Sequence, residues 1–366
     1  MHCIKFLCLF ILLSNCSTVN KIETSANHAS QKRLAKFEPA DSACLFFIGQ
    51  DLAATGGLIG YHDGYVDQFP TPTGVTVYTD LSPGASSFGF FLKGNDGLYS
   101  KANWGSGDNC AQCYLNDETY QYALMAIGLS LVGNEKAIAS GQRNNLIHTL
   151  ATWIKESKRP VFLRIGYEFD GWSWNHYNRQ QYLLAWKKIH QIFLEMKVEN
   201  VAFVWQSKGN GSGQDILENW YPGDDLVDWC AYSFFNNPDE EMLHFAKRHH
   251  KPVFIAEASP VLHNGVTFSN TRLTDSVITK KAWQEWFLPF LKTLQDNKDV
   301  IKAFSYINTD WHSQPMWVVN PVFQQVDSRI QMSKYVSKKW LEEMEHPRYL
   351  KPDTTLWSAL GFISKR

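Results

Sequence analysis

The chain has 366 residues and carries 35 Lys and Arg against 36 Asp and Glu, which gives a formal net charge of −1 at pH 7. A chain of this length can bury the core of one large domain. The balanced charge and the lack of a basic run argue against nucleic acid as a partner. Composition therefore favours a globular domain that does not bind nucleic acid.

Aromatic residues are abundant, with 14 Trp, 15 Tyr and 23 Phe. A large core would use them, and so would a cleft whose aromatic faces stack on flat ligands such as sugar rings. Several tryptophans, among them Trp104, Trp172, Trp174 and Trp311, stand beside glycine or polar residues rather than inside apolar runs. Core and cleft both stay open as explanations of this composition.

The N-terminal residues have the pattern of an export signal. Lys5 precedes an apolar run over residues 6–13, which is too short to span a bilayer but suits the apolar region of a secretion signal. The residues leading to Cys16 resemble a bacterial lipobox, with Asn15 in place of the usual small residue. We expect a signal over residues 1–16, a flexible tether over 17–40, and export to the periplasm, outer membrane or cell surface, or secretion. Membrane attachment through a lipidated Cys16 is an open alternative to free release.

The cysteines after the signal do not form a disulfide framework. Cys44 and Cys230 are isolated, while Cys110 and Cys113 form one C-x-x-C pair. That pair could be a redox pair, half of a zinc site or a local disulfide. No second pair of cysteines or histidines completes a metal set, so the pattern favours a local disulfide in an exported protein. We expect no metal and no cofactor.

Apolar, β-branched runs recur along the chain and alternate with helical patterns, which predicts a parallel sheet. The predicted strands are residues 44–48, 74–79, 123–131, 161–167, 201–205, 229–235, 253–256 and 301–307. The predicted helices are 137–158, 179–197, 240–250, 281–298 and 329–345. Eight strands in this length indicate an α/β fold of the (β/α)8 TIM barrel type over residues 41–350. A doubly wound open sheet is the alternative, although no Gly-x-Gly-x-x-Gly follows the first strand.

Two glutamates end the fourth and seventh predicted strands, where a parallel barrel forms its active site. Glu168 follows the run 161–167, and Glu257 follows 253–256. Two such carboxylates can flank a glycosidic bond across the barrel mouth. Arg164 shares a strand face with Glu168, so it could reach either carboxylate, and a salt bridge from Arg164 to Glu168 is the purely structural alternative.

The fourth strand and its loop, Arg164-Ile-Gly-Tyr-Glu-Phe-Asp-Gly-Trp-Ser-Trp174, resemble the strand-four motif of family 26 glycoside hydrolases. This family contains β-mannanases and related enzymes of a retaining clan built on the TIM barrel. Residues 220–228 resemble the Tyr-Tyr-Pro-Gly-Asp segment before its strand six, and residues 251–257 resemble the segment that carries its nucleophile. The resemblance implies that Glu168 is the acid/base, that Glu257 is the nucleophile and that Arg164 supports them.

The chain departs from the family pattern beside both carboxylates. Typical members have His before the acid/base, where this chain has Tyr167, and Asn two residues after it, where it has Asp170. Ser233 and Phe235 stand where the family has Asp and Tyr at the end of strand six. Since those groups contact the sugar, the departures affect the expected mannan specificity more than the hydrolytic chemistry.

Further residues at predicted strand ends are candidates for binding substrate. An apolar setting is expected to raise the pKa of Glu168, while Arg164 or Tyr232 would hold Glu257 ionised. For each of the others, ordinary packing is the alternative. The substrate-binding candidates are Arg164, Tyr167, Trp172, Trp174, Trp205, Tyr232, Trp311, Gln50 and Asp51.

These observations predict an exported retaining glycoside hydrolase that cleaves β-glycosidic bonds of a plant or algal polysaccharide, either β-mannan-like or a β-xylan or β-glucan. The alternative is a catalytically weak carbohydrate-binding lipoprotein on a hydrolase fold. The intact glutamate pair argues against that alternative, since burying an unused charge costs stability. An unrelated barrel enzyme with a metal centre would need a His/Asp cluster at the strand ends, and the sequence has none there.

Overall fold

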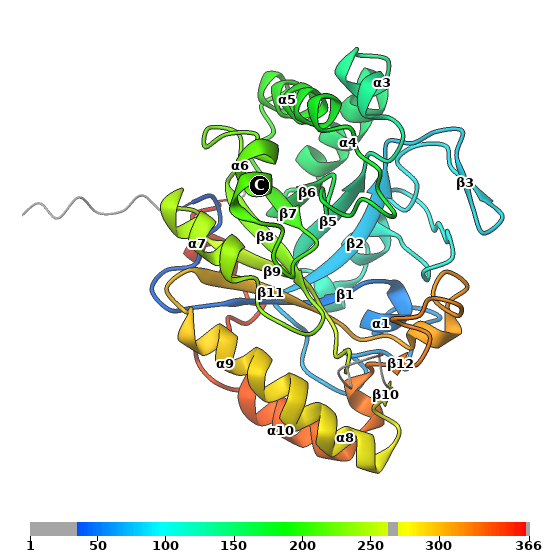
Figure 1. Cartoon of the computed structure of the whole chain (residues 1–366), viewed down its shortest axis with the longest axis vertical. Coiled ribbons are helices and arrows are strands. Elements are labelled where there is room, and N and C mark those ends of the chain that lie inside the picture. Colours follow the sequence, from blue (N-terminus) through cyan, green and yellow to red (C-terminus); the bar gives the residue numbers. More distant parts are fainter. Residues whose placement is uncertain (1–34, 263–269, 364–366) are drawn as a thin grey trace, which may run out of the picture. The chain divides into compact units, whose positions relative to one another are not determined.

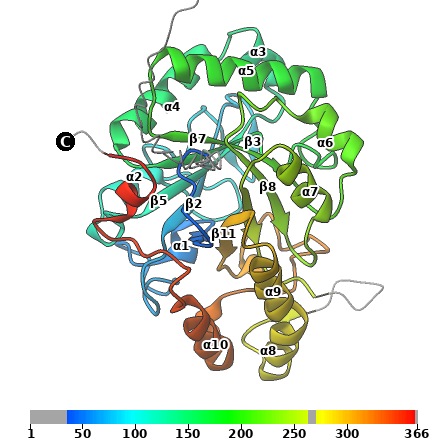
Figure 2. The same ribbon diagram turned by 90° about the vertical axis from the view of Figure 1, so that its left-hand side faces the viewer.

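The computed structural model describes residues 35–262 and 270–363. Eight parallel strands close into a barrel, and helices surround it (Figures 1 and 2). In chain order the barrel strands are β1 (Leu45–Gly49), β2 (Gly74–Asp80), β5 (Leu124–Ser130), β6 (Val161–Ile165), β7 (Val201–Ser207), β8 (Trp229–Phe234), β9 (Val253–Ala258) and β11 (Ile301–Ile307). Each strand pairs with its neighbours in the chain, and β1 pairs with β11 to close the barrel. The predicted TIM barrel and its eight strands are confirmed.

The helices follow the prediction less closely. The major outer ones are α4 (Asn144–Ser157), α5 (Arg179–Glu195), α7 (Glu240–Arg248), α9 (Leu288–Asp296) and α10 (Lys334–Met344). The single helix predicted over 137–158 is wrong, because α3 (Glu135–Ala139) ends before Gly141, whose φ of 84° ordinary residues avoid. The helix predicted over 281–298 begins earlier, as α8 (Ser276–Ala282), and passes through a π turn at Trp283–Phe287. The short α6 (Gln214–Trp220) was not predicted.

The lower half of the barrel interior is apolar. Phe162 lies at its centre and packs edge-on against Phe37, Phe47 and Trp229, with ring centroids 5.9, 5.5 and 5.2 Å away. Leu356 and Leu360, from beyond the predicted end of the barrel, belong to the same buried cluster. Phe37 lies in the predicted tether, so residues 35–40 and 351–362 both extend the barrel domain past its predicted limits of 41 and 350.

The upper half of the interior is polar. Thr76 of β2 and Ser305 of β11, the two strands that flank β1, share a hydrogen bond of 2.8 Å, and both side chains are buried. Above them lie Arg164, Gln206 and Glu257, contributed by β6, β7 and β9. Groups of this kind are buried only where they are paired. This polar layer lies at the end of the barrel where the strands terminate. A functional site is therefore expected at that end.

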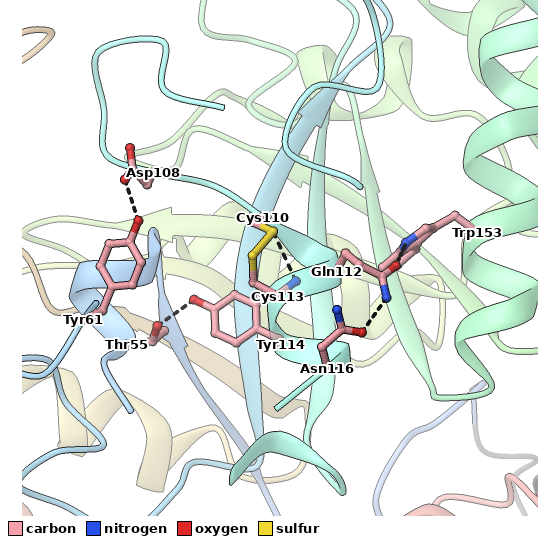
Figure 3. The surroundings of a disulfide bond; sticks show 9 residues. All are labelled: Thr55, Tyr61, Asp108, Cys110, Gln112, Cys113, Tyr114, Asn116 and Trp153. Carbon is pink, nitrogen blue, oxygen red and sulfur yellow. Dashed lines mark hydrogen bonds between the residues drawn. A yellow bond between two sulfur atoms is a disulfide. The ribbon is translucent and has the colours of Figure 1, made fainter. Parts of the chain in front are cut away.

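A disulfide joins Cys110 to Cys113 at the start of α2 (Ala111–Leu115), as Figure 3 shows, which confirms the predicted local pairing. Cys44 and Cys230 are free and buried. The helix is tied to its surroundings by a 2.6 Å hydrogen bond between the Thr55 and Tyr114 hydroxyls. The disulfide thus anchors the end of the loop that runs from Trp104 to Asn109.

Several predictions concern residues that the structure does not describe. The signal segment 1–16, Cys16 and residues 17–34 of the tether lie outside the described residues. Among the residues that are described, none belongs to a helix both long and apolar enough to cross a bilayer.

Candidate active site

A cleft of about 720 Å³ opens at the carboxyl ends of the barrel strands. Loops after β2, β6, β7 and β11 form its walls, and the strand ends form its floor. Both predicted carboxylates lie in this cleft. The lining includes Gln50, Tyr78, Asp80, Trp104, Tyr167, Glu168, Trp174, Asn175, Lys208, Phe235, Glu257, Trp311, Trp317 and Phe323.

Glu168 lies on a turn just beyond β6. Gly166 and Glu168 both have positive φ, of 54° and 50°, and the side-chain amide of Asn175 holds the turn by donating to the carbonyls of residues 167 and 168 at 3.0 and 2.8 Å. Oε1 of Glu168 accepts a hydrogen bond of 2.7 Å from the Ser233 hydroxyl, and Oε2 accepts one of 2.9 Å from the Trp174 indole. Both carboxylate oxygens therefore have a fixed direction in a site where the residue is only 9% exposed.

Glu257 lies inside β9, directly opposite Ser233 of β8 in the strand register. Its Oε1 forms a close ion pair with Nη2 of Arg164, and Gln206 Nε2 lies 3.5 Å from the same oxygen. A cation that donates to a carboxylate favours its ionised form. The negative charge of Glu257 is thus paired with the positive charge of a buried arginine.

Arg164 is completely buried. Its guanidinium carbon lies 5.2 and 5.3 Å from the ring centroids of Tyr78 and Tyr167, and these two rings contact each other edge-on at 5.3 Å. Nε donates to Oε1 of Gln206 at 2.8 Å. The structural alternative of an Arg164–Glu168 salt bridge is wrong, because the ion pair runs to Glu257.

The two carboxylates are joined by a chain of hydrogen bonds. Gln206 Nε2 donates to Ser233 Oγ at 3.0 Å, and Ser233 in turn donates to Glu168. Burial, and then the negative charge of Glu257, raise the pKa of Glu168 to about 8, while the Ser233 hydroxyl acts in the opposite direction. At neutral pH this raised pKa favours the protonated form of Glu168, while Glu257 beside it is ion-paired with Arg164.

Four of the predicted binding residues line the cleft together with the carboxylates: Gln50, Tyr167, Trp174 and Trp311. Trp311 stacks on Phe323 with the ring centroids 4.1 Å apart. Its indole nitrogen donates to Ser259 at 3.0 Å. Together the stacking contact and the hydrogen bond fix the orientation of the Trp311 ring in the cleft wall.

The other five predicted binding residues do not line the cleft, and Arg164 is one of them because it is buried beneath the carboxylates. Asp51 is buried and accepts from the Ala54 amide at 2.9 Å, capping α1 (Leu52–Thr55). Trp205 stacks on Phe169 in the core, with centroids 4.5 Å apart. Tyr232 is fully buried beside the inward-facing Ser233, so it cannot serve Glu257 as predicted. Trp172 is 56% exposed on the outer surface and packs edge-on against Trp220.

The sequence analysis missed several residues of the site. Tyr78 covers Arg164, and Gln206 orients it, yet neither was among the predicted site residues. Ser233 was noted only as a departure from the family pattern, although it contacts Glu168. The alternation of inward-facing and outward-facing residues along β2 and β7 could have identified Tyr78 and Gln206, because both face the barrel interior. Phe235, Trp317 and Phe323 come from loops that carry no such periodicity.

Across residues 35–262 and 270–363, no three His, Cys, Asp or Glu side chains come together in a way that could hold a metal. The two cleft glutamates already have protein partners in Arg164, Ser233 and Trp174.

A closed parallel barrel with one carboxyl of raised pKa and one ion-paired carboxylate at the ends of strands four and seven defines a site of the glycosidase type. The family model "Glycosyl hydrolase family 26" matches residues 126–321, more than half of the chain. The chain belongs to this family, as the resemblance of its strand-four motif implied.

Curated relatives share much of the sequence. A "Beta-1,3-xylanase" of Alcaligenes sp is 33% identical over 312 residues, covering 80% of this chain and 63% of the relative. "Beta-1,3-xylanase TXYA" of Vibrio sp is 32% identical over 340 residues, covering 88% of this chain and 69% of the relative. The chain thus spans about two thirds of the length of these relatives.

Solved structures of the family share the fold at low sequence identity. An endo-beta-1,4-mannanase of Cellulomonas fimi, solved as a double mutant, matches with a TM-score of 0.55 and 12% identity, over 88% of this chain and 74% of that one. The GH26 beta-mannanase BoMan26A of Bacteroides ovatus matches with a TM-score of 0.52 and 13% identity, over 86% and 92%. Both confirm the barrel architecture.

The Ser233–Glu168 contact predicts a shift in pH dependence. Removing the hydroxyl in Ser233→Ala takes away a donor that favours the ionised carboxylate, so the pKa of Glu168 rises further. If Glu168 must be protonated to act, kcat/KM falls as the pH rises through this pKa, and the alkaline limb of the profile should move to higher pH. One neutral hydrogen bond is worth about 1 kcal/mol, so the plateau should change by about fivefold at most. Ser233→Thr, which keeps the hydroxyl, should return the alkaline limb of the kcat/KM profile to its wild-type pH. An alkaline limb that does not move in Ser233→Ala would contradict Glu168 as the group that must be protonated.

Proposed function

We propose that this protein hydrolyses β-1,3-xylan with retention of configuration, with Glu168 as acid/base and Glu257 as nucleophile. The observation that carries the proposal is the contrast between the two carboxyls. Glu168 is kept protonated by burial and by the nearby charge of Glu257, while Glu257 is ion-paired with Arg164. Retaining glycosidases need this division between a proton donor and a nucleophile.

In the first step an oxygen of Glu257 attacks the anomeric carbon and forms a glycosyl ester. The glycosidic C–O bond breaks, and its electron pair stays with the leaving oxygen, which takes the proton of Glu168. Arg164 and Gln206 keep the attacking carboxylate in place through Oε1. Oε2 of Glu257 has no hydrogen bond to another described residue, and so it is the oxygen available for attack.

In the second step Glu168 acts as a base. Once Glu257 is esterified it carries no charge, so the repulsion that raised the pKa of Glu168 disappears and the carboxyl ionises more readily. The Glu168 carboxylate then takes a proton from water as the water oxygen bonds to the anomeric carbon. The ester bond to Glu257 breaks, and both groups return to their starting states.

The proposed substrate rests on the relatives and on the cleft. Both curated relatives are named beta-1,3-xylanases. The cleft departs from the mannanase pattern at Tyr167, Ser233 and Phe235, and all three lie at the carboxylates or on the cleft wall. An aromatic cleft with one protonated carboxyl suits a neutral pyranose polymer.

The test is a panel of mannan, β-1,3-xylan, β-1,4-xylan and mixed-linkage glucan, incubated with the wild type and with Glu257→Ala. We expect reducing sugar from β-1,3-xylan with the wild type, and a loss of about 10⁴-fold or more in Glu257→Ala, which lacks the nucleophile. Azide should rescue Glu257→Ala by forming a glycosyl azide of inverted configuration. No hydrolysis of any polymer, with binding retained, would favour a carbohydrate-binding protein instead.

The loss of glycosylation rate in Glu168→Ala should depend on the leaving group of the substrate. General acid catalysis contributes about 10²–10⁴-fold, and a good leaving group such as dinitrophenolate needs little of it. We therefore expect a large loss of glycosylation rate on xylo-oligosaccharides and a small one on dinitrophenyl glycosides, measured by pre-steady-state kinetics. Equal losses on both substrates would exclude Glu168 as the acid.

We also propose that the protein is exported and attached to a membrane through Cys16. The apolar run 6–13 and the lipobox-like residues before Cys16 support this proposal. Cells fed radiolabelled palmitate should label the wild type and not Cys16→Ala. Labelling of neither, with the protein found in the medium, would favour secretion without a lipid.

A further inference from the structure

A small hairpin projects from the barrel immediately after β2 (Figure 1). Its strands are β3 (Ser86–Ser87) and β4 (Phe90–Phe91), closed at the base by a 2.9 Å hydrogen bond from the Gly84 amide to the Leu92 carbonyl. The hairpin, residues 84–92, presents two exposed aromatic rings. Phe88 is 59% exposed and Phe91 is 60% exposed. Neither ring contributes to the core of the barrel.

The turn of the hairpin places Phe88 at a position that does not favour it. Phe88 and Gly89 are the two central residues, with φ of 45° and 82°. Two-residue turns of this kind prefer Asn or Asp at the first position, because bulky residues are strained at positive φ. A strained residue that exposes an aromatic ring is a candidate for a functional role.

The hairpin is part of the cleft wall. Ser86, Ser87 and Leu92 line the cleft, as does Trp104 of the following loop. The Ser87 hydroxyl donates to the carbonyl of Trp104 at 2.9 Å. The Phe88 ring lies so close to Gly105 that a Cβ at residue 105 would come within 2.6 Å of it.

A second hydrogen bond, from the loop after β11, supports this part of the cleft wall. The amide of Met316, in the loop after β11, donates to the carbonyl of Gly105 at 2.8 Å. The loop of Trp104 and Gly105 therefore connects the hairpin to the loop that carries Trp317. Residues of the hairpin, of the Trp104 loop and of the Trp317 loop therefore line one connected wall of the cleft, and Phe88 and Phe91 stand exposed beside it.

We propose that the hairpin 84–92 is a platform that stacks on neutral sugar units of the polysaccharide chain beyond those at the two carboxylates, an inference that rests on the proposed function. The segment Gly-Ala-Ser-Ser-Phe-Gly-Phe-Phe-Leu contains no charged residue, so it suits an uncharged polymer rather than a sulfated or acidic one. Its exposed rings offer faces to pyranose C–H groups, and its serines offer hydroxyl partners. A platform so far along the wall contacts only substrates long enough to reach it.

The test compares a long with a short substrate. Phe88→Asn removes the ring and places the favoured residue in the turn, so the thermal unfolding midpoint should not fall. We expect KM for β-1,3-xylan to rise about fivefold to twentyfold in Phe88→Asn and in Phe91→Ala, as one lost aromatic contact would give. The kcat/KM for an aryl xylobioside should stay at the wild-type value. Leu194→Ala, which truncates a residue 70% exposed on α5, should leave both substrates unaffected.

An unchanged ratio of polymer to short-substrate kcat/KM in both phenylalanine variants would overturn the platform while leaving the hydrolase assignment intact. A binding measurement tests the platform separately from the hydrolase function. Inactive Glu257→Ala should bind insoluble β-1,3-xylan in a pull-down, and adding Phe88→Asn should weaken that binding. If the wild type releases no sugar, the proposed function fails, and equal binding by the single and double variants would then overturn the platform as well.

Discussion

The site is organised around one buried cation. A guanidinium with no exposure to water is stable only if its charge and its N–H groups are satisfied nearby. Arg164 achieves this with Glu257, Gln206 and the neighbouring rings of Tyr78 and Tyr167. Satisfying Arg164 fixes Glu257, and it also orients Gln206, which holds Ser233 against Glu168. The positions of both carboxylates therefore follow from the requirements of a single side chain, and removing that side chain would leave Glu257 as an unpaired buried charge.

The barrel and the carboxylates were predictable because their signals are local. Each strand is an apolar run between helical segments, and a glutamate at the end of such a run has no packing reason to be there. The faces of individual strands were harder to assign. Trp205 and Tyr232 each stand one residue before an inward-facing polar residue, Gln206 and Ser233, so an error of one position turned two core aromatics into predicted ligands. An irregularity in the β8–β9 register between residues 232 and 233 adds to that difficulty.

The cleft walls could not be predicted in the same way. Residues such as Trp317 and Phe323 reach the cleft because the loop after β11 bonds to Gly105, a residue more than two hundred positions away in the chain. The loop after β2 depends on the disulfide at Cys110 and on the contact between Ser87 and Trp104. The disulfide has a local signal in its C-x-x-C spacing, but the Met316–Gly105 and Ser87–Trp104 contacts have none, since each exists only after the barrel has brought its loops together.

The two carboxylates differ in how the backbone carries them. Glu257 is a member of β9, paired on both sides by β8 and β11, so its main chain can shift only if the whole barrel shifts. Glu168 stands on a turn outside the strand ladder. The turn is held by the side chains of Ser233, Trp174 and Asn175, and by backbone hydrogen bonds from the Gly171 amide to the Glu168 carbonyl and from the Phe169 amide to the Gln206 carbonyl. A nucleophile has one target, the anomeric carbon, and gains from immobility. A proton carrier must meet a departing oxygen and then an arriving water at slightly different points. The fold thus carries the nucleophile on a strand paired on both sides and the proton carrier on a turn, where a small rotation of the side chain does not require the barrel strands to move.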